Sequence, residues 1–178
     1  MALAPVAPLP PAPRTLRLRD GRSVRVRPIA PSDAEPLRAF DGGLSEASHR
    51  FRYQGRMPRM TSEQALAMAN VDFAHHYALV ATAGQEGDEA VVADCRLDAD
   101  EGLPAELAVA VADDHQCLGL GPALIRQLLE IAAGRGIAIV EAHVRSDNRH
   151  MLHVLRRLGF RETAEDLGIV TFSAPTPV

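Results

Sequence analysis

The residues with the clearest chemical potential are two glycines, Gly119 and Gly121, which lie between a run of apolar residues and a strongly periodic helical segment. The apolar run at 105–112 is typical of a buried strand, and leucines and an isoleucine recur at helical spacing across 119–133. Glycine lets the backbone approach a ligand closely, and unpaired amides at the start of a helix attract anions. The segment therefore predicts a binding loop for a phosphate or a diphosphate.

Three kinds of phosphate-binding loop compete for this segment. The loop of nucleoside triphosphatases requires a lysine after its last glycine, and the chain contains none. The dinucleotide pattern Gly-x-Gly-x-x-Gly fails because Leu124 stands where the third glycine is required. The third pattern, Gln/Arg-x-x-Gly-x-Gly/Ala between a strand and a helix, fits Gln116, Gly119 and Gly121. A tight strand-to-helix connection without any ligand is the structural alternative.

The third pattern resembles the acyl-CoA loop of the GNAT superfamily of N-acetyltransferases. A later segment, 146–160, contains Asn148 and ends in Leu-Gly-Phe, which is similar to another helix of that family. The front half resembles the acetyltransferase domain of bacterial protein-lysine acetyltransferases, which is often fused to an acyl-CoA-synthetase-like or cyclic-nucleotide-binding domain. The short motifs that carry this likeness lie at 26–29, 44–45, 50–51, 70–72 and 78–81. The resemblance covers roughly residues 24–172.

The resemblance implies a fold and a co-substrate. The fold is a single mixed α/β (α+β) domain, with a mostly antiparallel sheet of six or seven strands flanked by helices. The co-substrate is acetyl-CoA, attacked directly by a primary amine of a protein lysine or of a small molecule. Arg149 or Arg157 could reach the adenosine phosphate, and Asn148 is also a good helix cap. The implied cofactor-binding residues are Val109, Val111, Gln116, Cys117, Leu118, Gly119, Leu120, Gly121 and Asn148.

Acetyl transfer to an amine requires a deprotonated nucleophile, and two carboxylates are candidates for the general base. Glu106 is the only charge between Pro104 and Ala112, and the resemblance assigns the matching glutamate this role. Its structural alternative is a strand residue that merely faces solvent. Asp94 is the rival, because it follows an apolar run at a position where the resembling subgroup tends to be apolar. Asp94 could act as a base, an amine anchor or an edge residue.

One position departs from the family pattern. Many GNAT enzymes carry a tyrosine seven residues after the asparagine that matches Asn148, where it protonates the leaving thiolate, and this chain has Leu155 there. A thiol pKa of about 8.5 lets the thiolate leave near neutral pH without strong acid help. The resembling subgroup also tends to lack this tyrosine. A catalytically silent acyl-CoA-binding sensor or scaffold is therefore the alternative function.

The elements that must position these residues follow from periodicity and turn chemistry. A first strand is expected at 24–29, a helix begins at Ser32 or Asp33, and further helices begin at 45 and at 61–62. Segments 77–83 and 91–97 are expected to form a hairpin. The strand at 105–112 and the helix at 119–133, which flank the glycine loop, follow it. Strand 137–144, a helix from Asp147 or Asn148 to about Leu158, and strand 169–172 complete the domain at 15–172. Residues 1–14 form an Ala/Pro-rich leader expected to be disordered, and 173–178 a flexible tail.

The distribution of charged residues limits the classes of binding partner that are expected. Residues 1–59 contain eleven Arg against five acids, and residues 60–115 one Arg against twelve acids, so an acidic middle suits a cationic acceptor. The basic first third lacks the aromatic residues of a nucleic-acid motif, so no nucleic-acid partner is expected. No membrane span, disulfide or metal site is expected, and the two cysteines suit a reducing cytoplasm. The oligomeric state, including a homodimer, is left open.

Overall fold

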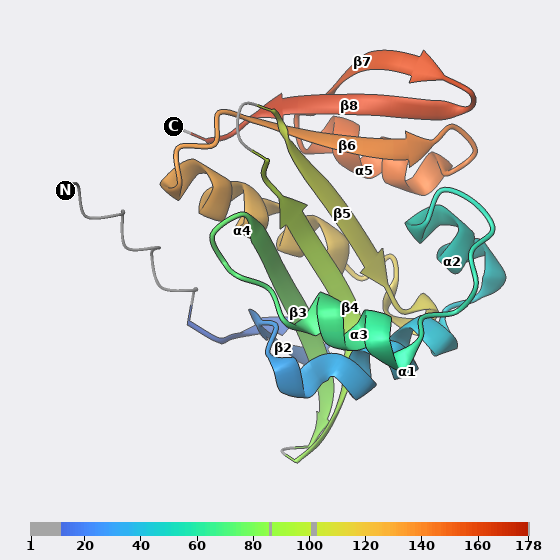
Figure 1. The fold of residues 1–178 in the computed structure, drawn as a ribbon, viewed down its shortest axis with the longest axis vertical. Coiled ribbons are helices and arrows are strands. Elements are labelled where there is room, and N and C mark those ends of the chain that lie inside the picture. Colours follow the sequence, from blue (N-terminus) through green and yellow to red (C-terminus); the bar gives the residue numbers. More distant parts are fainter. Residues whose placement is uncertain (1–11, 86, 101–102, 178) are drawn as a thin grey trace.

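An eight-stranded sheet organises the chain in the computed structural model, which describes residues 12–85, 87–100 and 103–177 (Figure 1). The strand order is β1-β2-β3-β4-β5-β6-β8-β7, and only β5 and β6 are parallel neighbours. The strands are β1 (Arg14–Arg17), β2 (Ser23–Pro28), β3 (His76–Gln85), β4 (Asp88–Asp98), β5 (Ala105–Val111), β6 (Ile139–Arg145), β7 (Arg161–Asp166) and β8 (Ile169–Pro175).

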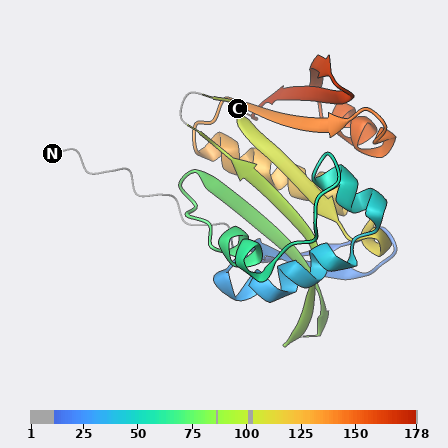
Figure 2. The same ribbon diagram turned by 45° about the vertical axis from the view of Figure 1, so that its right-hand side comes forward.

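Helices cover both faces of this sheet (Figures 1 and 2). On one face, α1 and α3 pack on residues such as Ala78 and Val80 of β3, and α2 lies over β5. On the other face, apolar residues of α4 and α5 share one core cluster with sheet residues such as Leu79 and Ala81. This division follows from the strand period of two, which sends alternate side chains of β3 to opposite faces. The helices are α1 (Ala34–Gly43), α2 (Glu46–Arg52), α3 (Ser62–Ala69), α4 (Leu120–Gly134) and α5 (Arg149–Arg157).

Strands β5 and β6 diverge soon after they meet. Only Ala105 and Glu106 of β5 have registered partners on β6, whereas the whole stretch from Glu106 to Val111 is registered with β4. The amide of Ala112 donates to Val92 on β4 at 2.8 Å. Because backbone groups alternate in direction along a strand, those of Val109 and Val111 point toward the β6 side. They therefore line the gap where the two strands have parted.

The expected number of strands is corrected by the sheet. Eight strands replace the expected six or seven, because β1 and β7 were not anticipated. Strand β7 is exposed at all six positions, so it lacks the alternation of apolar residues that marks a half-buried strand. The other expected strands and helices are confirmed, with ends that shift by a few residues.

The expected domain boundaries also shift. Arg14, assigned to the leader at 1–14, begins β1 and pairs with Val26, while residues 1–11 lie outside the described residues. The expected tail at 173–178 starts too early, because β8 continues to Pro175 through its pairing with β6. Among the described residues, the helices are all too short or too polar to cross a lipid bilayer.

Candidate functional site

The glycine loop lies between the end of β5 and the start of α4. A 3₁₀ turn, Asp113–His115, leads into the loop, and the backbone then takes left-handed φ angles of 60° at Cys117 and 91° at Gly119. Helix α4 begins at Leu120, so the amides of its first turn have no acceptor within the helix. The positive end of the helix dipole reinforces these donors. The loop therefore presents a set of N–H groups suited to an oxyanion such as a diphosphate.

Gln116 braces the loop through its side chain. Its Nε2 donates to the carbonyl oxygen of Val111 and to Oγ of Ser48, both at 3.0 Å. The first bond caps the end of β5 on the side that faces the gap, and the second ties the loop to α2. Gln116 was expected to bind the cofactor, and the structure gives its side chain a supporting position beside the amides.

Asp113 anchors the same loop to the start of α2. Its carboxylate accepts hydrogen bonds from the amide of Ser45 at 3.0 Å, Oγ of Ser45 at 2.7 Å and Oγ of Ser48 at 2.7 Å. Partial burial opposes the charged form, but these hydrogen bonds outweigh it and lower the pKa of Asp113. Sequence reasoning missed this contact, although it placed a helix start at Ser45. The pairing across 68 residues has no local signal.

The turn between β1 and β2 packs against the other side of the loop. The amide of Arg19 donates to the carbonyl of Leu118 at 3.2 Å, and Arg22 donates to the carbonyl of Asp114 at 2.6 Å. Nε of Arg19 would lie 3.6 Å from a Cβ added at Gly119. Within the described chain Arg19 has no ion pair, so its guanidinium adds a positive charge beside the loop amides. The sequence offered no signal for this docking.

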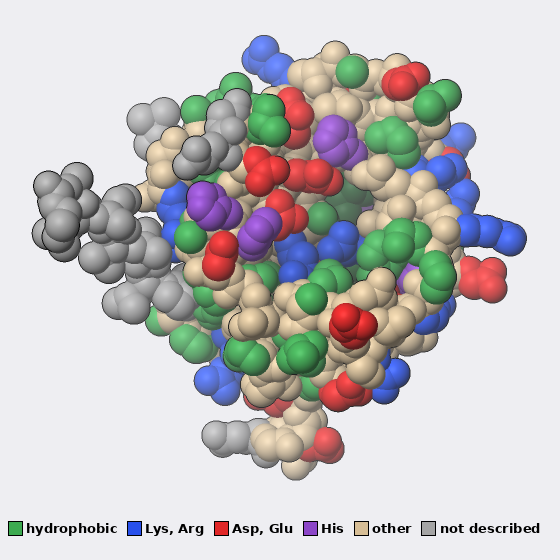
Figure 3. Space-filling model, viewed as in Figure 1, with side chains coloured by type: hydrophobic (Ala, Val, Ile, Leu, Met, Phe, Trp, Pro, Cys, Tyr) green, Lys and Arg blue, Asp and Glu red, His purple; other side chains and the backbone are tan. Residues whose placement is uncertain are grey.

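Glu106 lies where β5 and β6 begin to part, and its side chain is exposed. It is paired in register with Asp98 on β4 and with Glu141 on β6, so three carboxylates share one row of the sheet. Cross-strand partners project from the same face, which is the face that carries α1, α2 and α3. Figure 3 shows acidic and histidine side chains gathered on this face around a hollow. The arrangement can attract and hold a cationic amine next to Glu106.

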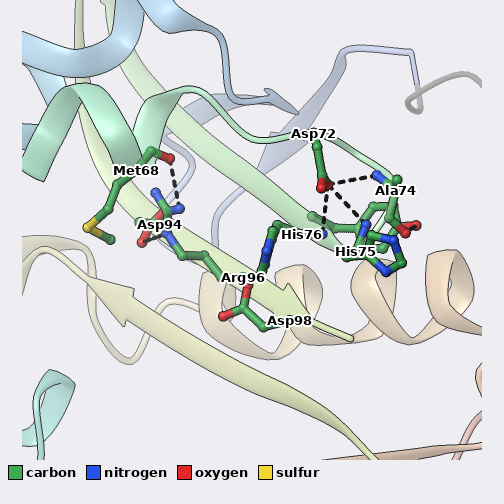
Figure 4. A network of polar contacts seen from close by, with 9 residues as sticks. Met68, Asp72, Ala74, His75, His76, Asp94, Arg96 and Asp98 are labelled. Carbon is green, nitrogen blue, oxygen red and sulfur yellow. Dashed lines mark hydrogen bonds and ion pairs between the residues drawn. The ribbon is translucent and has the colours of Figure 1, made fainter. Parts of the chain in front are cut away.

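Histidine and backbone contacts fix the edge of this acidic row (Figure 4). Nδ1 of His76 lies 2.8 Å from Oδ1 of Asp98, and this hydrogen bond raises the pKa of His76. The carboxylate of Asp72 accepts bonds from the amides of His76, His75 and Ala74, which lower the pKa of Asp72 to about 2. Asp72 is therefore a fixed negative charge at neutral pH.

Asp94 is buried in the centre of the sheet and is not an edge residue. Its Oδ2 accepts from Nε of Arg96 at 2.9 Å and from Nη2 of Arg52 at 3.4 Å. Only 3% of its side chain is exposed. Two guanidinium groups already contact this carboxylate, and it is buried away from solvent. Its geometry therefore favours a role in anchoring a ligand over a role as the general base.

The remaining candidate residues lie on or near α5, where one caps the helix, one is buried in the core and two are exposed. Asn148 caps α5 by accepting from the amide of Met151 at 3.2 Å. Leu155 is buried in the core, and Arg149 and Arg157 are exposed on α5. Among the described residues, no group of three His, Cys, Asp or Glu side chains is placed to hold a metal ion.

The two cysteines lie in different surroundings. Cys117 is exposed in the loop, whereas Cys95 is buried in β4, where burial raises the pKa of its thiol. Both are free thiols. Since Cys95 is enclosed in the core, Cys117 is the thiol that reagents in solution can reach.

Comparison with known proteins places these features in a family. Residues 45–160 match the model of the acetyltransferase (GNAT) family. The chain is 33% identical over 145 residues to acetyltransferase PA5475 of Pseudomonas aeruginosa, which covers 80% of this chain and 77% of that protein. It is 31% identical over 168 residues to acetyltransferase Pat of Mycolicibacterium smegmatis, covering 93% of this chain and 49% of that protein.

A solved structure agrees with these relatives. The GNAT domain of S. lividans PAT superimposes with a TM-score of 0.83 at 29% identity, covering 92% of this chain and 96% of that domain. The chain thus spans nearly all of that isolated domain, but about half the length of the M. smegmatis protein. The part shared with the solved structure is a GNAT domain, and the remainder of the longer relative lies outside the alignment.

Proposed function

The chain belongs to the acetyltransferase (GNAT) family, and on this premise we propose that it transfers an acetyl group from acetyl-CoA to a primary amine by direct attack. The acceptor amine belongs to a protein lysine or to a small molecule. The observation that carries the proposal is the parting of β5 and β6 immediately after Glu106. This gap leads along β5 to the glycine loop, so one strand connects a carboxylate, free backbone groups and an anion site.

The residues present fit coenzyme A. The amides of residues 117–121 suit its diphosphate, and the left-handed φ of Gly119 keeps that backbone accessible. Both backbone groups of Val109 and the amide of Val111 face the gap, where an extended pantetheine arm could pair with them as a strand would. The bound co-substrate supplies a thioester, which is an activated acyl donor.

Glu106 would then prepare the acceptor. A lysine-like amine has a pKa of about 10.4 and is charged at neutral pH, so it must lose a proton before it attacks. The exposed carboxylate of Glu106 accepts that proton directly or through water. An amide of Val109 or Val111 would donate to the thioester oxygen as negative charge develops there. Leu155 supplies no acid, so the thiolate would leave unaided, as its ordinary thiol pKa of about 8.5 permits.

Two measurements on the purified chain test this proposal. Isothermal titration with acetyl-CoA measures binding, and a thiol-release assay on a panel of amines measures turnover. We expect binding together with turnover of at least one primary amine. Binding without turnover on any amine would instead support the silent acyl-CoA-binding module, which the absence of a tyrosine at 155 favours. Failure to bind acetyl-CoA would reject both functions.

A further inference from the structure

A buried charged cluster lies beside the proposed site and has no role in the steps above. It consists of Asp94 and Arg96 on β4 and Arg52 at the end of α2. Both guanidinium groups contact the same oxygen, Oδ2 of Asp94. Nη1 of Arg96 also donates to the carbonyl of Met68 at 2.8 Å, and Figure 4 shows Arg96 between Asp94 and Met68. Two positive charges therefore face one negative charge, which leaves a net charge of +1 in a buried place.

Two polar atoms of this cluster have no partner among the described residues. Nη2 of Arg96 and Oδ1 of Asp94 are both buried and make no hydrogen bond. The side chains of these residues are 9% and 3% exposed. Unpaired buried polar atoms are rare because each loses its hydration without compensation, and the loss is larger when the group is charged. One unpaired donor and one unpaired acceptor therefore point to a ligand that offers both kinds of partner.

The cluster lies on the same face as Glu106 and close to it. Arg96 is registered with Ala108 and Asp94 with Ala110. The residues of β5 beside the charged groups on this face therefore have small alanine side chains. Figure 3 shows basic side chains at the floor of the hollow on this face, with acidic side chains around them. A molecule entering the hollow would thus meet negative charge at the rim and positive charge at the floor.

We propose that the acceptor is a free amino acid that carries a second amine on its side chain. Its carboxylate pairs with Arg96 and Arg52, its α-ammonium group donates to Oδ1 of Asp94, and its distal amine reaches Glu106. Planar guanidinium groups suit a carboxylate because their N–H donors match its two oxygens. This inference rests on the proposed function and names the substrate class of the same site.

The spacing agrees with such a molecule. Arg96 and Asp98 are two residues apart on β4, and Glu106 is registered with Asp98, so the Arg96 and Glu106 rows are about 7 Å apart at about 3.4 Å per residue. The Asp94 row lies about 14 Å from Glu106 by the same count, but the Asp94 carboxylate leans toward Arg96 and meets its Nε at 2.9 Å, so the two groups that would hold the α-carbon end lie together. A side chain of three or four methylene groups spans that distance. Arg52 is held to Asp94 only by a 3.4 Å contact and is the more exposed guanidinium, so it is the group that moves when the acceptor enters.

Other acceptors fit the floor less well. A lysine within a protein has neutral amides where the free amino acid has its carboxylate and ammonium group, so it would leave Nη2 of Arg96 without an ionic partner. A polyamine brings only positive charge to a cluster that already has an excess of it. Both acceptors would still match the acidic side chains around the hollow. The buried cluster of Asp94, Arg96 and Arg52 is therefore what distinguishes free diamino acids, protein lysines and polyamines.

Matched acceptors test the proposal directly. The thiol-release assay would compare lysine with cadaverine, which lacks the carboxylate, with 6-aminohexanoate, which lacks the α-ammonium group, and with Nα-acetyl-lysine methylamide, which mimics a protein lysine. We expect kcat/KM for lysine or ornithine to exceed that of each analogue by at least tenfold. Equal or higher values for cadaverine or for the methylamide would overturn the inference while leaving the proposed function intact. No turnover of any amine would count against the proposed function instead.

Variants separate recognition from folding. Arg96→Lys keeps the charge but replaces the three guanidinium nitrogens with one ammonium nitrogen, and Arg52→Gln removes the more exposed guanidinium. We expect both to raise KM for lysine at least tenfold, with little change in KM for cadaverine or in affinity for acetyl-CoA. Arg38→Gln, on α1 with its own surface partner Glu35, is the matched control. If Arg96→Lys proves unfolded, Arg52→Gln alone decides, and an unchanged KM for lysine would overturn the inference.

Discussion

Glu106 and Glu141 form the last registered pair between β5 and β6. Beyond them the parallel strands part, so the backbone of β5 continues toward the glycine loop with one side unpaired. The fork thus places a carboxylate at one end of the gap and the glycine loop at the other. Under the proposed function this relationship gives the site its direction, because the acceptor would lie near Glu106 and the phosphates near α4.

The first prediction concerns the proposed base. Replacing Glu106 with Gln removes the proton acceptor and preserves the size of the side chain, so kcat should fall by roughly 10²-fold or more. Affinity for acetyl-CoA, measured by isothermal titration, should change little because Glu106 does not face the loop. Glu141→Gln is the matched control, since it changes a carboxylate in the same row. Equal losses in the two variants would mean that Glu106 contributes only to the negative charge of the row that it shares with Asp98 and Glu141, and is not the base.

The second prediction concerns the loop. A Cβ added at Gly121 would lie 3.8 Å from Cγ2 of Val111, which is ordinary contact, so a side chain is accommodated there. Gly121→Asp should therefore fold, and an acidic residue in the first turn of α4 even favours the helix. Its carboxylate would occupy the anion position and abolish binding of coenzyme A in isothermal titration. Gly121→Asn supplies the neutral control, and tight binding by the Asp variant would refute the assignment of the loop.

The third prediction concerns the hairpin that packs on the loop. Arg19→Ala removes the guanidinium beside Gly119, which has no ion pair with any described residue, so affinity for coenzyme A should drop severalfold and depend less on salt. Titration with coenzyme A, 3′-dephospho-coenzyme A and phosphopantetheine would show which phosphate loses the contact. Arg25→Ala, on β2 away from the turn and near Glu89, is the control and should bind normally. Identical affinities for the two variants would contradict the prediction.

The fourth prediction is a pH dependence. The hydrogen bond to Asp98 raises the pKa of His76 above its ordinary value of about 6.5. A raised pKa means that the pair stabilises the folded chain fully below about pH 6.5 and that this contribution is lost as pH rises through the folded pKa. NMR titration of the histidine ring should show the raised value, and Asp98→Asn should lower it. A His76 pKa unaffected by that substitution would show that the pair does not form in solution.

The fifth prediction concerns a buried ion pair at the start of α1. Asp33 accepts from both terminal nitrogens of Arg27, at 2.6 and 2.7 Å, and from the amide of Ala30 at 2.7 Å. Asp33→Ala leaves a partly buried cation unpaired, so the free energy of unfolding should fall by about 3 kcal/mol in urea denaturation. Glu35→Ala breaks only the exposed pair with Arg38 and should cost about 0.5 kcal/mol or less. Similar losses in the two variants would contradict this difference.

Local patterns predicted much of the fold. The hairpin of β3 and β4, the glycine loop and helix α4 were all expected, because their periodicity and turn residues lie within short stretches of chain. Strands β1 and β7 were missed for a physical reason. The exposed residues of β7 give no alternation, and β1 begins directly after an Ala/Pro-rich segment that conceals it. Both strands owe their conformation to the neighbours with which they pair.

The candidate site divides in the same way. Glu106, Gly119 and Gly121 were found from the sequence, because a lone charge in an apolar strand and a Gly-x-Gly turn are recognisable without any partner. Asp94 was also identified, but its role could not be chosen. The residues that surround it, Arg52 and Arg96, gave no signal.

The sequence by itself determined which segment can bind an anion and which strand carries the carboxylate, since φ requirements and side-chain alternation are properties of a few consecutive residues. Only the tertiary structure decided where β5 and β6 part, that Arg22 reaches the carbonyl of Asp114 across 92 positions, and that Arg52 meets Asp94 across 42 positions. Such contacts depend on the register and packing of elements that are far apart in the chain. The free energy of that packing is distributed over the whole sheet, so no single residue type in the sequence indicates these contacts.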